Sequence, residues 1–592
     1  MKFLIRISSF LCLVCFSGMS CLALDREAFT FTNYDLQVRI EPEQQRLGVR
    51  GKITLRNDSS TPQKFAVLQI SSSLDWRSIT IAGKTPQFLL QPYTSDIDHT
   101  GALSEAIVTL PQEIAPHGSV ELEIGYEGVI PPDATRLTRI GTPDDAAKNS
   151  DWDQISANFT AVRGVGYVTW YPIATDSANL SDADGLFEVL GRWKQREVGS
   201  SMHFKISVSR DGASPGQLIL NEPTCMLVYE AMGGAQLANA DCMFQPLGLR
   251  SPTFAAANYG SVSRPSITVF NLPTHAAAAS AYADVAEQAA SVIENWFGPL
   301  HGKLQVADLP NPDAAPFGSG SVLLAPLPDS GTQPSGLAVA YQLTHLAVWS
   351  SRPWIDEGLA HFAQALYLEQ EKGRQAALDY MAAHRGALLR SEGSAVGSGS
   401  TDQAARSLIN TTDQIYLQSK ALSVWWMLRD MIGDAALRKA ISLYRPEQDK
   451  EPSYMQRLIQ AQTQRDLEWF FDDWVYRDRG LPDFKIESVY PRQTMSGAFI
   501  VTVTVDNLGS AGAEVPVILK FAAANQESPN QAGANRAGEN HDITKRLELH
   551  SKSRDTIRIE APSRPVEVVV NDGSVPESDT SNNSFAIETP QK

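Results

Sequence analysis

The residues with the clearest chemical potential lie between positions 336 and 366, in the stretch GLAVAYQLTHLAVWSSRPWIDEGLAHFAQAL. If this stretch is helical, positions 341 and 345 share one face a single turn apart. Two histidines at that spacing can chelate one zinc ion. Here only His345 is a histidine, because position 341 is Tyr341.

A second helix, predicted to begin near Trp354, could present further metal ligands. Glu357 offers a carboxylate, and His361 follows it by one turn. His345, Glu357 and His361 could therefore form a rearranged three-ligand site. The structural interpretation, which we favour, makes His345 a hydrogen-bonded core histidine and His361 a partly exposed helix residue.

The order of segments around His345 resembles the aminopeptidase N family (peptidase M1) of the gluzincin zinc metallopeptidase clan. The resemblance rests on WFG at 296–298, WIDEGLA at 354–360 and the later motifs SKA, MLRD and WFF, and it covers roughly residues 30–490. It implies a thermolysin-like middle domain, peptide bond hydrolysis and a zinc site. In that site His345 matches the second histidine ligand and Glu357 the third ligand.

The chain departs from the family pattern at most of the remaining site positions. Tyr341 stands at the position of the first histidine ligand, and Gln342 at that of the general base. The loop that holds a substrate's amino terminus in the family is replaced by 317–321, FGSGS, which contains no carboxylate. The tyrosine that assists the transition state would fall at Gln418, although Tyr416, two residues earlier, could substitute.

These replacements predict an impaired metal site. A phenol with a pKa near 10 must lose its proton to be a good ligand, whereas a neutral imidazole needs no such step at pH 7. The amide of Gln342 is not basic enough to take a proton from water, and losing a general base costs about 10²- to 10⁴-fold in rate. We therefore expect no cofactor, and we keep zinc as the alternative.

The elements that must position these residues follow from hydrophobic periodicity. Alternation at 34–40 predicts strands, the Ala-rich run at 276–298 predicts a helix, and alternation returns at 498–507. The expected fold class is multidomain α+β. Its expected parts are a signal peptide (1–23), an antiparallel β domain (24–265), a mainly helical gluzincin-like domain (266–485) and an Ig-like β-sandwich (486–592).

The end of the chain contains an acidic turn, PESDTSNN at 576–583. It resembles the terminal turn of CARDB-like modules, which are bacterial Ig-type domains linked with adhesion. Its carboxylates could hold Ca²⁺. An ordinary acidic hairpin turn is the alternative that we favour.

The cysteines and the N-terminus predict export. Residues 1–23 combine Lys2 and Arg6 with an apolar stretch, as a secretory signal does. Outside that segment only Cys225 and Cys242 remain, and an oxidising compartment would join them in a disulfide. An uncleaved membrane anchor and two free thiols are the respective alternatives. We expect a periplasmic, secreted or envelope-associated protein.

The charge and the damaged motif together define three hypotheses for function. A net charge of -17 without a basic run argues against nucleic acid as a partner, and the mature chain shows no transmembrane segment. The first hypothesis is a pseudopeptidase that binds a peptide or protein ligand in an interdomain cleft or serves as a scaffold. The alternatives are an active zinc metallopeptidase with atypical ligands and an envelope adhesion or structural module.

Overall fold

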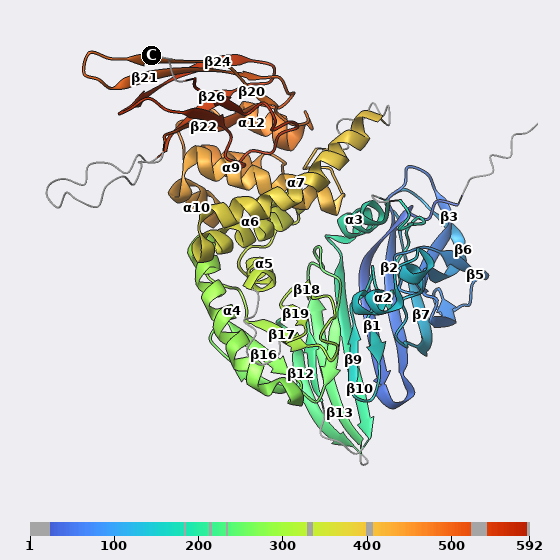
Figure 1. The fold of residues 1–592 in the computed structure, drawn as a ribbon. Coiled ribbons are helices and arrows are strands. Elements are labelled where there is room, and N and C mark those ends of the chain that lie inside the picture. Colours follow the sequence, from blue (N-terminus) through green and yellow to red (C-terminus); the bar gives the residue numbers. More distant parts are fainter. Residues whose placement is uncertain are drawn as a thin grey trace, which may run out of the picture.

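A computed structural model describes residues 24–182, 185–211, 216–232, 235–327, 336–397, 407–522 and 542–588. The expected signal peptide lies outside these residues. Three regions follow one another along the chain: sheets at the N-terminus, helices in the middle and a tail of strands, with the helices lying between the other two (Figure 1).

The N-terminal region is built on a seven-stranded sheet. In its strand β1, Leu36, Val38 and Ile40 are buried while Gln37 and Arg39 face the other side, as alternation predicts. The strand order is β12 (Met226–Met232), β13 (Ala235–Phe244), β10 (Ser201–Asp211), β1 (Phe29–Glu41), β2 (Arg46–Asn57), β7 (Ser119–Val129) and β4 (Leu74–Thr80).

One pair of strands corrects the expectation of an antiparallel domain. β1 and β10 pair in parallel, with Tyr34 opposite Met202, whereas the other neighbours in this sheet are antiparallel. A parallel pair requires a long crossover, and the chain between β1 and β10 contains several further strands and helices. Strand alternation cannot reveal the direction of such a distant partner.

Two smaller sheets and three short helices complete the N-terminal region. One sheet has the order β11 (Gln217–Leu220), β14 (Phe254–Ala257), β9 (Phe159–Val162) and β8 (Gln154–Ile155). The other has the order β3 (Gln63–Ser71), β6 (Ala102–Ile114) and β5 (Phe88–Thr94). The helices are α1 (Thr135–Arg139), α2 (Asp144–Ser150) and α3 (Gly185–Glu197). The core between them includes the buried aromatic residues Trp170, Tyr171 and Trp193.

The middle region begins with a five-stranded mixed sheet. Its order is β15 (Gly260–Ser263), β16 (Ile267–Asn271), β17 (Leu304–Asp308), β19 (Val322–Ala325) and β18 (Phe317–Ser319). β15 pairs with β16, so this sheet starts before residue 266. Helix α4 (Ala276–Phe297) packs on β16 through its alanine-rich face and ends at Gly298, which has a positive φ.

The helices of the middle region pack around α5 and α6, which lie side by side. Trp354 at the start of α6 stacks on Trp425 with ring centroids 5.2 Å apart, which anchors that end of the helix. Among the described residues no helix is long and apolar enough to cross a membrane. The helices are α5 (Gly336–Ala347), α6 (Pro353–Lys372), α7 (Arg374–Gly397), α8 (Gln414–Tyr416), α9 (Leu422–Ile432), α10 (Asp434–Leu443), α11 (Tyr454–Gln460) and α12 (Glu468–Phe471).

The tail consists of two antiparallel sheets that share their core with the helices. The first is β20 (Phe484–Gln493), β21 (Phe499–Asn507) and β24 (Arg554–Ala561). The second is β23 (Ile543–Leu549), β22 (Ala513–Lys520), β25 (Glu567–Val570) and β26 (Ser584–Ala586). One hydrophobic cluster includes residues from Ile267 in β16 to Val575, and Trp474 donates to the Gly512 carbonyl at 2.7 Å. The tail is therefore packed onto the helical region.

The acidic turn of the tail is organised by internal hydrogen bonds. The Glu577 carboxylate accepts from the Asn571 side chain at 2.5 Å, from the Asn583 side chain and from the backbone nitrogen of Phe484 at 3.2 Å. Burial raises the pKa of Glu577 to about 7. Because the Glu577 carboxylate already accepts these hydrogen bonds, it is poorly placed to bind Ca²⁺. An ordinary hairpin turn, the interpretation that we favoured from the sequence, fits these contacts better.

Candidate functional site

A cavity of about 730 Å³ lies between the N-terminal region and the helices. Tyr167, Leu190 and Lys194 line it from the N-terminal region, and Phe317 and Trp349 from the middle region. The side chains of Tyr341, Gln342, His345, Asp356 and Glu357 also reach it. Helices α5 and α6 therefore bring these candidate site residues to the wall of a cavity between the two regions.

Tyr341 and Glu357 form a direct hydrogen bond across the two helices. The Tyr341 hydroxyl donates to Glu357 Oε2 at 2.6 Å. Burial raises the pKa of Tyr341 well above its usual value, and the negative charge of Glu357 raises it further. The phenol consequently stays protonated and serves Glu357 as a donor, which is the opposite of a metal ligand's role.

The Glu357 carboxylate remains charged in spite of its position. Burial by itself would raise its pKa, but the neighbouring His345 and the hydrogen bond from Tyr341 act against burial, and the pKa of Glu357 is lowered. Only 9% of Glu357 is exposed. Its charge is thus stabilised by protein groups that are already in place.

Gln342 is held against the loop after β18. Its amide nitrogen donates to the Gly320 carbonyl, and the residue is buried. A Cβ at Gly318 would lie only 2.0 Å from Gln342 Oε1, so the close approach requires glycine there. The amide oxygen has no hydrogen-bond partner among the described residues. An amide is not basic enough to take a proton from water, so Gln342 supplies no general base.

Asp356 is a member of the site that the sequence did not indicate. One atom each from His345, Asp356 and Glu357 lie within 4.8 Å of one another. His345 Nδ1 is 3.4 Å from Asp356 Oδ2, and Ser350 donates its backbone N–H to Asp356 Oδ1 at 2.9 Å. Burial opposes a charge on His345, but Asp356 outweighs it and raises the pKa of His345. Asp356 therefore orients His345 and favours its protonated form.

His361 is not part of this group of three, although its ring centroid lies 5.2 Å from that of Tyr341. Its Nδ1 is 2.9 Å from Gln364 Oε1, and the residue is 7% exposed, so the expectation of a partly exposed position is wrong. Burial lowers the pKa of His361 to about 4, which keeps the imidazole neutral. The three side chains that lie together are therefore His345, Asp356 and Glu357, and not His345, Glu357 and His361.

Lys194 of α3 approaches the carboxylates from the opposite wall. Burial lowers the pKa of Lys194, while the charges of Glu357 and Asp356 act in the other direction. No local pattern marks this lysine, because its two acidic neighbours belong to a distant helix. It supplies a positive charge to the carboxylate pair from the N-terminal region.

Tyr416, the candidate for transition-state assistance, does not line the cavity; Gln414 from the same turn does. The Tyr416 side chain is buried, and its hydroxyl accepts a hydrogen bond from Lys420 Nζ at 2.6 Å. Lys420 also pairs with Asp478. These contacts tie Tyr416 to an internal ionic cluster.

The donor set differs from that of a zinc peptidase centre with two histidines, a carboxylate and a bound water. It comprises one imidazole and two carboxylates. Glu357 already receives a hydrogen bond from Tyr341. Gln342 cannot act as a base. Glu357 and His345 thus already have protein partners, and Gln342 supplies no general base.

Removing the Tyr341 hydroxyl tests how much its hydrogen bond to Glu357 stabilises the folded protein. We expect Tyr341→Phe to lower the free energy of unfolding by about 1–3 kcal/mol, because a buried charged carboxylate loses a donor. The midpoint of urea unfolding at pH 7 measures the change. Tyr490→Phe alters the same atom at an exposed tail position and should leave the midpoint unchanged. Equal midpoints for Tyr341→Phe and the parent would contradict the expectation.

No protein family and no curated protein matches this sequence. Among solved structures, the chain is similar to the M1 zinc metallopeptidase of Deinococcus radiodurans, with 15% identity, a TM-score of 0.44 and coverage of 77% of this chain and 95% of that one. A mutant of an M1 zinc metallopeptidase from the same organism, bound to a Tyr-Ser-Ala substrate, has 15% identity, a TM-score of 0.46 and coverage of 77% and 96%. A two-domain mutant bound to L-tryptophan has 15% identity, a TM-score of 0.44 and the same coverage. These similarities assign no activity to the chain.

Proposed function

We propose that this chain is an exported, aminopeptidase-like protein that has lost peptide hydrolysis and holds an extended peptide or protein segment in its cavity. The observation that carries the proposal is the hydrogen bond from Tyr341 to Glu357, because it places a protonated phenol where a metal ligand is needed. The anchored amide of Gln342 supports the same conclusion.

The walls of the cavity suit a peptide. Tyr167 and Phe317 meet edge to face at 5.3 Å on one side, and Trp349 lies on another. Aromatic walls of this kind bury apolar side chains, and Lys194 and the carboxylates offer charges for a polar backbone or terminus. A recess of about 730 Å³ can bury several residues of an extended chain.

Export is supported by the bond between Cys225 and Cys242. The two sulfur atoms are joined in the structure and link the residue before β12 to β13. Disulfides persist in oxidising compartments, so the proposal places the mature chain in the periplasm, in the envelope or outside the cell. The proposed protein needs no cofactor.

Filling the cavity with a larger side chain should weaken ligand binding without unfolding the protein. Leu190→Trp puts an indole into the recess from α3, and we expect affinity for fluorescein-labelled casein to fall about ten-fold or more, corresponding to at least ~1.4 kcal/mol. Fluorescence anisotropy reports binding, and release of labelled fragments from the same casein reports hydrolysis. We expect the parent to bind casein and leave it intact.

The matched control is Leu89→Trp, which makes the same change at an exposed position on β5 and should bind as the parent does. Unchanged binding by Leu190→Trp would place the ligand elsewhere. Zinc-dependent casein cleavage by the parent would refute the loss of hydrolysis.

One observation favours the second candidate, an active metallopeptidase with atypical ligands. His345, Asp356 and Glu357 could serve as three ligands without Tyr341. Zinc analysis of the purified parent separates the two candidates. Stoichiometric zinc that is lost with His345→Ala would favour the metallopeptidase, and its absence would favour the binding protein.

A further inference from the structure

Strand β12 forms an open apolar edge of the seven-stranded sheet. Among the described residues its strand neighbour is β13 alone. Four consecutive large hydrophobic residues are exposed on it: Met226 by 67%, Leu227 by 42%, Val228 by 51% and Tyr229 by 40%. Successive strand residues point to opposite faces, so both faces of this edge are apolar.

Soluble proteins normally protect such edges with charges, prolines or a covering element. The sequence of β12 is MLVYEAM, in which Glu230 is the only charged residue and proline is absent. The disulfide between Cys225 and Cys242 holds the start of the strand against β13. β12 is therefore a preformed template for pairing with another strand.

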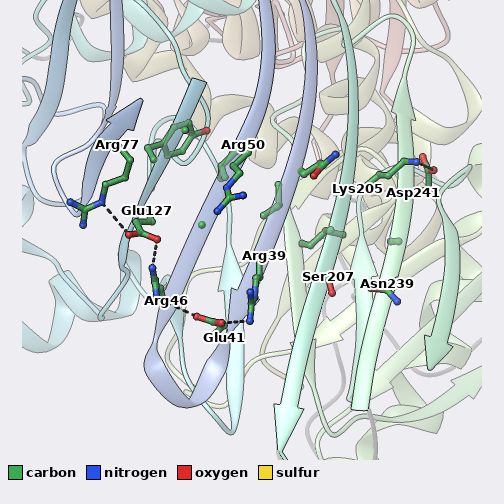
Figure 2. A pocket seen from close by; sticks show the side chains of 18 of the residues that line it. Arg39, Glu41, Arg46, Arg50, Arg77, Glu127, Lys205, Ser207, Asn239 and Asp241 are labelled. Atoms are coloured by element: carbon green, nitrogen blue, oxygen red, sulfur yellow. Dashed lines mark hydrogen bonds and ion pairs between the residues drawn. The ribbon is translucent and has the colours of Figure 1, made fainter. Parts of the chain in front are cut away.

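The groove beside this edge is poorly suited to bind a charged ligand, because most of its charged side chains pair with one another. It measures about 1310 Å³ and reaches β12 through Met226 and Val228. Figure 2 shows that its cations are largely neutralised within the sheet: Arg39 pairs with Glu41 at 2.6 Å, and Arg46 and Arg77 both contact Glu127. Lys205 pairs with Asp241 at 3.4 Å. The exposed apolar residues of β12 are thus a better candidate for binding a partner than the charged groove beside them.

We propose that β12 pairs antiparallel with β12 of a second copy of this chain, with the two-fold axis at Val228. In this register Val228 lies opposite the partner's Val228, and Leu227 lies opposite the partner's Tyr229. Pairs of aromatic and aliphatic residues across strands are favourable. The two sheets would join into one continuous sheet, and the proposal does not depend on what the cavity binds.

The position of Glu230 is compatible with an axis at Val228 and disfavours an axis at Glu230 itself. With the axis at Val228, each Glu230 lies opposite the partner's Met226, and the two carboxylates are separated by roughly 13 Å along the strands. An axis at Glu230 would place the two carboxylates directly opposite each other, which destabilises a strand pair. About Val228 the apolar residues of β12 therefore face one another while the two carboxylates stay apart.

Introducing a charge at position 228, on the proposed two-fold axis, provides the test. We expect the mature chain, residues 24–592, to sediment as a dimer, and Val228→Lys and Val228→Glu each to sediment as monomers because like charges meet at the axis. Mixing the two variants should restore a dimer. Leu89→Lys adds the same charge at an exposed position on β5 and should remain dimeric. A monomeric parent, a dimeric Val228→Lys or a mixture that stays monomeric would overturn the proposal.

A cysteine variant tests the register even if the charged variants fold poorly. Opposed residues in an antiparallel pair have Cα atoms about 4.5–5.5 Å apart, which suits a disulfide. Oxidised Val228→Cys should therefore run as a covalent dimer on a non-reducing gel, whereas Leu89→Cys should not. Failure of Val228→Cys to cross-link under conditions where the parent is dimeric would exclude this register.

Discussion

Replacing Tyr341 by His and Gln342 by Glu together is expected to convert the cavity wall into a zinc site. The imidazole introduced at position 341 lies one helical turn from His345, and Glu357 loses its hydrogen bond from the phenol and becomes available. The carboxylate introduced at position 342 cannot donate to the Gly320 carbonyl as the amide does. It should therefore turn towards the cavity, where a general base is required.

The measurement is metal content after dialysis against trace zinc, followed by hydrolysis of fluorescein-labelled casein. We expect about one zinc per chain in the double variant and little in the parent. A gain in rate is expected only with Gln342→Glu, since a general base contributes about 10²- to 10⁴-fold. Adding His345→Ala to the double variant should remove the zinc again. Equal zinc content and equal turnover in parent and double variant would defeat the prediction.

Replacing Lys420 by Met is expected to lower the free energy of unfolding more than Tyr341→Phe does. The Lys420 side chain is fully buried, pairs with Asp478 and donates to the Tyr416 hydroxyl. Removing one partner of a buried ion pair leaves an uncompensated charge and costs about 3–5 kcal/mol. The midpoint of urea unfolding at pH 7 should fall accordingly.

The pH dependence of this loss identifies its cause. Burial would raise the pKa of Asp478, but Lys420 outweighs burial and lowers it. In the parent the pair's contribution is therefore present above the unfolded pKa of this carboxyl and is lost as the pH falls through its lower folded pKa. Without Lys420 burial dominates, so the variant's deficit should be greatest near pH 7 and shrink towards acid pH.

Two controls accompany this experiment. Lys420→Met combined with Asp478→Asn removes both charges and should recover much of the loss. Lys148→Met breaks a pair with Asp144 on the surface of α2 and should leave the midpoint unchanged. A deficit for Lys420→Met that does not vary with pH would show that lost packing, and not an unpaired carboxylate, is responsible.

For the tail, the sequence predicted local features but not how the tail packs on the rest of the protein. Alternation at 498–507 predicted the strand that is β21, and the acidic turn resembled a module linked with adhesion. In the structure the tail shares a hydrophobic core with the helices, and Arg546 reaches Asp430 of α9 at 3.2 Å. Such shared burial couples the tail to the helical region. An adhesive role for the tail stays a hypothesis from the sequence.

The sequence by itself determined the local elements and the chemistry that is missing. Alternation placed β1, the alanine-rich run placed α4, and the types of residues 341 and 342 excluded a second imidazole and a base. These are properties of single residues and of neighbours within one helical turn or one strand, so periodicity and side-chain chemistry suffice to predict them.

Only the tertiary structure decided which groups meet. It set the hydrogen bond from Tyr341 to Glu357, brought Asp356 to His345, placed Lys194 against the carboxylates and left β12 as an open edge. Each of these depends on how separate elements pack or pair, and the partners of Lys194 and β1 lie more than a hundred residues away in the sequence. Long-range packing leaves no local pattern, and it alone decides which of these groups contact one another.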